Sequence, residues 1–146
     1  MGFWIFMLAM GLLFPAIMIL FGAVFTKTAP KKINYIFGYR TDMSMKNRET
    51  WDFAHKNLGD LWFKLGAPLL AVTSVVSLLV FRESTKQITT WCCVIFVIQL
   101  VIMVLPVVYT EKALKENFDE NGKWKKGAKE KWQEREQKLK KDYQQE

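Results

Sequence analysis

The chain has 146 residues, of which 51% are hydrophobic and 24% are charged, and its formal net charge is +7 at pH 7. This length leaves room for one domain. The mean hydropathy is close to zero, but long apolar runs fill the first 110 residues, while Lys, Glu and Gln dominate the rest. A sequence segregated in this way excludes an ordinary soluble domain and indicates a membrane-embedded body with a charged tail.

Three apolar runs are long enough to cross a membrane as helices. Residues 1–26 carry no charge, and at ~1.5 Å per residue they exceed the ~30 Å hydrocarbon core. A second uncharged run covers residues 87–110. Between them, residues 61–81 reach the required length if Lys64 extends its ammonium group to the lipid headgroups. We therefore predict an all-α integral membrane protein with three transmembrane helices.

These runs divide the chain into a membrane domain of residues 1–110 and a charged tail of residues 111–146. The first run lacks the basic start of a signal peptide and is longer than its apolar region, so we expect a retained span. The Met-Gly start is not a myristoylation motif, because Phe6 stands where that motif needs Ser or Thr.

The distribution of Lys and Arg predicts the orientation. Residues 27–64 carry eight of these cations and the tail carries eleven, whereas the turn after the second span has only Arg82 and Lys86. Cytoplasmic segments are enriched in Lys and Arg. We expect the N-terminus outside, with residues 27–64 and the tail in the cytoplasm. Topology and attraction to anionic lipid headgroups account for the charge, so direct nucleic-acid binding is not expected.

The loop of residues 27–60 contains two elements. Residues 33–39 are too apolar for a free loop and too short to span, so we expect them in the membrane interface or under the bundle. Ser44 or Asn47 can cap the helix that follows. Apolar residues then recur on one helical face, at Trp51, Ala54, Leu58, Leu61, Trp62 and Leu65, and polar residues take the other, at Lys56, Asn57 and Asp60. We predict an amphipathic cytoplasmic helix that leads, with a bend near Gly66 and Pro68, into the second span.

Few residues within the spans suggest specific contacts. Ala67 and Ala71 form a small-xxx-small pair, which lets helices approach closely. Gln99 is the strongly polar residue in the middle of the third span and should make an interhelical hydrogen bond. Cys92 and Cys93 are neighbours whose side chains diverge on a helix, so we read them as small apolar residues.

The tail begins with a turn and continues as a helix. Asn121-Gly122 lies between Phe118 and Trp124, which predicts a short hairpin. Residues 125–146 are rich in helix-forming residues with few apolar anchors, so we expect a solvated or lipid-associated helix.

Little in the sequence points to catalysis or to a cofactor. The single histidine, His55, has no accompanying nucleophile motif, and one His without a ligand cluster does not predict a metal site. No Gly-rich phosphate loop is present, so we expect no cofactor. His55 is read as a polar residue that contacts a phosphate, the backbone or a partner.

The densest group of unusual polar residues lies before and within the start of the amphipathic helix. Two readings stay open for it: a binding site for a phosphate, a carboxylate or a peptide end, or a structured turn that docks the helix on the bilayer. The candidate binding residues are Gly38, Tyr39, Arg40, Thr41, Ser44, Lys46, Asn47, Trp51 and His55.

The segment from Gly38 to Gly59, GYRTDMSMKNRETWDFAHKNLG, resembles the SdpI-like family of bacterial membrane proteins, named for immunity to a sporulation-delaying peptide toxin. His55 stands where Asn is more common in that family. The matching positions are Gly38, Tyr39, Arg40, Thr41, Ser44, Trp51 and Ala54. The resemblance implies a multi-pass protein of the bacterial cell membrane that protects against a membrane-active toxin, in some systems while sequestering a transcriptional repressor.

Three hypotheses follow. The first is a toxin-immunity or toxin-sensing protein whose segment from Arg40 to Trp51 binds the toxin or a cytoplasmic regulator. The second is a non-catalytic accessory subunit of a membrane complex that uses the small residues of the second span. The third, with the least support, is an enzyme acting on lipid headgroups, with Arg40 and Lys46 holding phosphate and His55 as the base.

Overall fold

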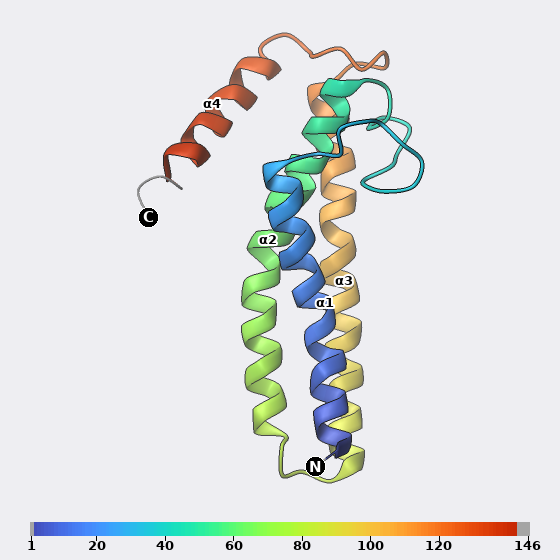
Figure 1. The fold of residues 1–146 in the computed structure, drawn as a ribbon, viewed down its shortest axis with the longest axis vertical. Coiled ribbons are helices and arrows are strands. Elements are labelled where there is room, and N and C mark those ends of the chain that lie inside the picture. The colour runs from blue at the N-terminus through green and yellow to red at the C-terminus, as the bar shows by residue number, and fades with distance from the viewer. Residues whose placement is uncertain (1, 143–146) are drawn as a thin grey trace.

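The structure is a computed structural model that describes residues 2–142. Three long helices and one short helix follow each other along the chain (Figure 1). They are α1 (Gly2–Lys27), α2 (Arg48–Leu79), α3 (Thr85–Asn117) and α4 (Ala128–Asp142). The first three are long and apolar enough to cross a membrane, which confirms the predicted all-helical, three-span class.

The three long helices lie side by side, and each connection returns the chain along the bundle (Figure 1). A short turn joins α2 to α3 at the end where α1 begins. At the opposite end α1 finishes, α2 starts and α3 finishes, and residues 28–47 and 118–127 also gather there. We call the segment Gly38–Gly59 the motif, and this second end, where the motif lies, the motif end. The loop and the tail therefore lie at the same end, as a three-span topology requires.

Both later spans continue past their apolar runs as unbroken helices. The expected amphipathic helix and the second span are one helix, α2, which continues through Pro68. Membrane helices tolerate an internal proline when neighbouring groups satisfy the freed backbone carbonyl. Helix α3 likewise runs past Thr110, to Asn117, and Phe118 is its C-cap. The motif end is thus built on two rigid helical extensions.

Two glycines bring α1 and α2 together. A Cβ atom at Gly22 would lie 2.6 Å from the backbone nitrogen of Phe63, and one at Gly59 would lie 2.7 Å from the backbone nitrogen of Thr26. Ala67 and Ala71 are exposed on the outer side of α2. Their predicted role as a contact face for another helix therefore stays a prediction, because spacing alone does not say which of several small-residue faces meets a neighbour within the bundle.

The polar side of the predicted amphipathic helix is also buried, which corrects that prediction. The Asn57 amide donates to the Thr110 hydroxyl of α3 at 3.1 Å. The Asp60 carboxylate accepts from Lys64 at 2.9 Å and from Arg135 of α4 at 3.1 Å. Because α3 and α4 supply these partners, the first part of α2 has neighbours on most sides and no broad solvent face.

Gln99 links all three spans in the middle of the bundle. Its amide nitrogen lies 2.8 Å from the Gly11 carbonyl of α1 and 2.9 Å from the Thr73 hydroxyl of α2. The side chain is fully buried. This is the kind of interhelical contact that a mid-membrane amide predicts.

The tail folds back onto α2. Phe118 and Trp124 form an antiparallel bridge around the Asn121-Gly122 turn, as the predicted hairpin requires. Helix α4 then runs parallel to the start of α2. The contacts that align them are Glu49 with Lys129 at 2.8 Å, Lys56 with Glu136, Asp60 with Arg135, and the stacked rings of Phe53 and Trp132. The described part of the tail helix is docked, whereas residues 143–146 of the expected helix lie outside the described residues.

Candidate functional site at the motif end

The motif begins at a glycine that no other residue can replace without strain. Gly38 has a φ of +112°, and a Cβ atom there would lie 2.2 Å from Nε2 of His55. The positive φ suits glycine, and the missing side chain admits the imidazole ring. Gly38 thereby lets the loop turn onto the His55 ring.

His55 is fully buried and uses both ring nitrogens. Its Nε2 accepts from the backbone N–H of Tyr39 at 2.9 Å, so its Nδ1 carries the proton and donates to the Trp51 carbonyl at 2.8 Å. His55 lies in the charged first part of α2, outside the apolar run. Burial lowers the pKa of the imidazole, while the Trp51 carbonyl and Asp52 partly oppose this shift. A neutral imidazole with both nitrogens engaged holds the loop and is not free to act as a base.

Tyr39 continues the connection from the loop to α3. Its hydroxyl lies 3.1 Å from the Val107 carbonyl and 3.2 Å from a carboxylate oxygen of Glu111, and its single proton serves one acceptor at a time. Burial raises the pKa of this phenol, and the negative charge of Glu111 raises it further. Tyr39 therefore stays protonated as a donor. Through Tyr39 and His55, three segments far apart in sequence meet at one point.

Trp51 fixes the connector that follows α1. The indole is fully buried, and its Nε1 donates to the Pro30 carbonyl at 3.1 Å. The Arg48 guanidinium donates to the carbonyls of Pro30 and Lys31 at 2.8 and 2.5 Å. One turn of α2 thus satisfies the backbone of a polar connector that would otherwise need water.

Thr41, Ser44 and Asn47 shape the turn before α2. The hydroxyl of Ser44 accepts from the Thr41 N–H at 2.9 Å, and Ser44 is fully buried. Asn47, one of the two predicted candidates, is the N-cap of α2 and forms a capping box with Thr50. These contacts are local and give the motif a structured turn, whereas the docking of this turn on the bilayer stays a prediction.

Lys46 and Asn47 contact the tail. The Asn47 amide donates to the Gly122 carbonyl at 2.6 Å, and the Lys46 ammonium donates to the Glu120 carbonyl. Gly122 has a φ of +75°, and a Cβ atom there would lie 2.6 Å from the Asn47 amide nitrogen. The hairpin of the tail therefore occupies two side chains that the sequence offers to a ligand.

Arg40 and the apolar tip of the loop stay exposed. Tyr35 and Ile36 are 84% and 90% exposed, and the Arg40 guanidinium donates to the Tyr35 carbonyl. The ring of the neighbouring Phe37 packs against the ring of Phe21 of α1, with the two ring centroids 5.8 Å apart. Because Phe21 lies inside the apolar run of α1, the loop tip sits level with the edge of the membrane span.

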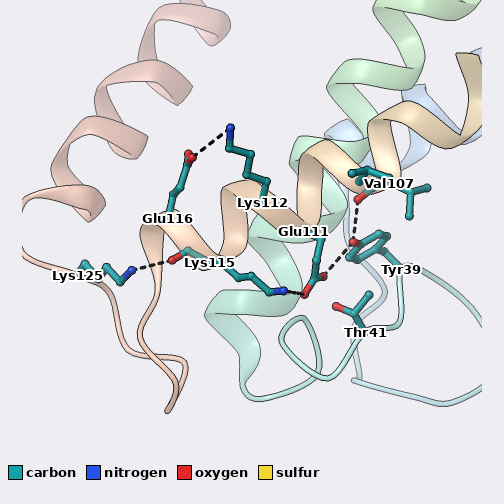
Figure 2. Close-up of a pocket in the computed structure, with 9 residues that line it drawn as sticks. Tyr39, Thr41, Val107, Glu111, Lys112, Lys115, Glu116 and Lys125 are labelled. Carbon is teal, nitrogen blue, oxygen red and sulfur yellow. Dashed lines mark hydrogen bonds and ion pairs between the residues drawn. The ribbon is translucent and has the colours of Figure 1, made fainter.

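A cleft of about 770 Å³ opens beside Tyr39, between the loop and the end of α3 (Figure 2). Figure 2 shows the lysines and glutamates of α3 around it, with Tyr39 at its inner wall. The lining residues are Tyr39, Thr41, Val107, Val108, Glu111, Lys112, Lys115, Glu116 and Lys125. Of these, the sequence singled out only Tyr39 and Thr41 as candidate binding residues. The spacing of Val108, Lys112 and Lys115 on one helical face was the signal that could have located the rest.

The predicted binding residues therefore divide into three groups by burial. Tyr39, Ser44, Trp51 and His55 are buried and hold the motif end together. Gly38, Thr41 and Asn47 are partly buried in the same turn, and Arg40 and Lys46 are exposed. Their role in binding a ligand stays a prediction, because the structure brings them together around the protein's own backbone.

Three membrane-spanning helices with a buried polar cap at one end define a small multi-pass membrane protein. The model of the SdpI/YfhL protein family matches residues 31–110, more than half of the chain, and includes the whole motif. The chain belongs to the SdpI/YfhL protein family. No curated protein and no solved structure matches it.

Proposed function

We propose that this chain is a non-enzymatic protein of the bacterial plasma membrane that confers immunity to, or senses, a membrane-active peptide toxin. The motif end faces the cytoplasm in this proposal. Nineteen of the 21 Lys and Arg residues lie in the two segments that meet there, and the positive-inside rule favours that side. Membership of the SdpI/YfhL family supports the immunity role.

The observation that carries the proposal is the contrast within the motif. Its buried members, Tyr39, Trp51 and His55, form a rigid support, and this support presents Arg40 and the apolar tip at Tyr35 and Ile36. A membrane-active peptide has apolar and polar faces, and an exposed aromatic, aliphatic and guanidinium group can meet both. A cytoplasmic regulator could occupy the same exposed surface, since it needs only such anchors.

Survival of a toxin-sensitive bacterium under a panel of sporulation-delaying-type peptide toxins tests the proposal. Wild-type protein should protect. Arg40→Gln and Ile36→Ser proteins of equal membrane abundance should lose most of that protection, since neither side chain is buried. The matched control is Lys32→Gln, an exposed cation of the same loop, which should protect like wild type. Full protection by both site variants would move the site elsewhere, and no protection by wild type would count against immunity.

A second function is favoured by the exposed alanines of α2. Ala67 and Ala71 lie one turn apart on its outer side, where small residues allow another helix to approach. An accessory subunit would use this face. Purification from the membrane should then yield a fixed partner that is lost in an Ala67→Leu, Ala71→Leu double variant. A monodisperse protein without a partner would contradict this reading.

A further inference from the structure

One face of α3 changes from apolar to cationic where the span ends. Val101, Val104 and Val108 are exposed along this face, and Lys112 and Lys115 continue it at helical spacing. The uncharged run ends at Thr110, so these two ammonium groups lie within about one and a half turns of the membrane edge. The stripe thus has the polarity of a phospholipid, with the charged end at headgroup depth.

The cleft beside Tyr39 lies along the charged end of this face of α3. Val107 and Val108 form its apolar part, and Lys112, Lys115 and Lys125 lie around its polar part (Figure 2). With Glu111 and Glu116 counted, the cleft keeps one net positive charge. Its apolar floor is continuous with the lipid-facing side of α3. A soluble polar ligand would leave this apolar floor uncovered, whereas a lipid would cover it with an acyl chain.

The lysines are free enough to bind a phosphate. Lys112 is 72% and Lys115 is 70% exposed, and their ion pairs with Glu116 and Glu111 are both 3.9 Å long. Exposed ion pairs of this kind contribute little to stability, so releasing them costs little. The carboxylate of Glu111 also keeps a second partner, because the Tyr39 hydroxyl lies 3.2 Å from it. Turning both ammonium groups to a phosphate therefore leaves the fold intact.

We propose that this cleft binds one anionic phospholipid, with its phosphate on Lys112 and Lys115 and an acyl chain along Val108 and Val104. Lys125 stands at the same rim, where its ammonium donates to the Lys115 carbonyl at 2.7 Å. The proposal rests on the end of α3 and is independent of toxin immunity. It also differs from general attraction to a charged surface, since it requires a single site.

Native mass spectrometry of the full chain in detergent, with phosphatidylglycerol or phosphatidylcholine added at equal concentration, tests the site. Wild-type protein should retain one phosphatidylglycerol and bind it roughly tenfold more tightly than phosphatidylcholine. The Lys112→Gln, Lys115→Gln double variant should lose that preference. Its matched control is Lys31→Gln, Lys32→Gln, which removes the same charge from an exposed loop at the same end and should keep the preference.

Two further arms separate the sources of the effect. Inorganic phosphate at millimolar concentration should not displace the lipid, because the acyl chain contributes to binding; displacement would reduce the site to a phosphate site and overturn the proposal. Val108→Trp fills the apolar floor and should weaken retention with all charges intact. Equal binding of the two lipids by wild type would also overturn it, as would an unchanged preference in the Lys112 and Lys115 double variant.

Discussion

The membrane-spanning part and the motif end are held together by different means. Along the spans, α1 and α2 meet through bare backbone at Gly22 and Gly59, and one amide, Gln99, adds directional contacts. At the motif end, buried aromatic rings and polar side chains satisfy loop backbone one group at a time. In lipid, apolar side chains gain little by moving from the acyl chains into the bundle. Close packing and a few hydrogen bonds therefore hold the helices together. At the motif end, water restores the hydrophobic effect, and burial of aromatic rings becomes the main stabilising term.

The largest expected effect lies at the motif end. Trp51→Ala removes a fully buried indole and its bond to Pro30, and should destabilise that end by about 3–5 kcal/mol. Limited proteolysis in mild detergent checks this, with cleavage expected in residues 28–47 while the spans stay intact. Trp91→Ala, an exposed tryptophan of α3, is the control. Loss of the whole bundle in the Trp51 variant would show that the two regions do not unfold separately.

The next effect lies in the spans. Gly22→Val drives a branched side chain into the backbone of α2 and should cost about 1–3 kcal/mol or more, because neither helix can retreat without losing contact elsewhere. The unfolding of purified protein in mixed micelles measures it. Ala71→Val adds the same bulk on the exposed side of α2 and should change little. An equal loss of stability in Gly22→Val and Ala71→Val would contradict a close contact of α1 and α2 at Gly22.

His55 makes the motif end pH-dependent. Its folded pKa is lowered by burial, so the unfolded chain takes up a proton first as the pH falls. Its contribution to stability is complete above the unfolded pKa, about 6.5, and is lost as the pH falls from there toward the folded pKa. Thermal melts between pH 8 and pH 5 should show this loss in wild type. They should show less of it in His55→Asn, which cannot titrate in this range, and parallel curves for the two proteins would contradict the assignment.

The smallest effect is expected at Gln99. Gln99→Leu removes two interhelical hydrogen bonds, but within residues 2–142 the carbonyl oxygen of this amide is buried without a partner. Losing that unsatisfied acceptor offsets part of the cost, so the net destabilisation should be about 1 kcal/mol or less. The same micelle unfolding assay measures it, with Gln133→Leu on the exposed side of α4 as control. A loss as large as that of Gly22→Val would mean that polar contacts dominate the spans.

Local patterns predicted the elements well, because their causes are local. Runs without charge marked the spans, the candidate caps Ser44 and Asn47 marked the start of α2 to within a turn, and Asn121-Gly122 marked the hairpin. Burial of Asn57 and Asp60 was not predictable in this way. Their partners, Thr110 and Arg135, lie 53 and 75 residues further along the chain.

The candidate site shows the same division. The sequence located the motif, but it could not show that the backbone of the protein already occupies most of its polar groups. His55 and Tyr39 meet across 16 residues, and Tyr39 meets Glu111 across 72. The cleft on α3 was missed because its walls come from three segments, the loop, α3 and the connector that carries Lys125, which are far apart in the sequence.

The parallel contact of α4 with α2 has one more consequence, for how the tail finds its place. Glu49 with Lys129 and Lys56 with Glu136 share an offset of 80 residues, so a single alignment satisfies both pairs. If α4 slid by two turns, Glu49 would face Glu136 and repulsion would replace attraction. The order of charges on α4 therefore fixes its register along α2. Any protein that competes for this face of α2 has to present the same order of positive and negative side chains.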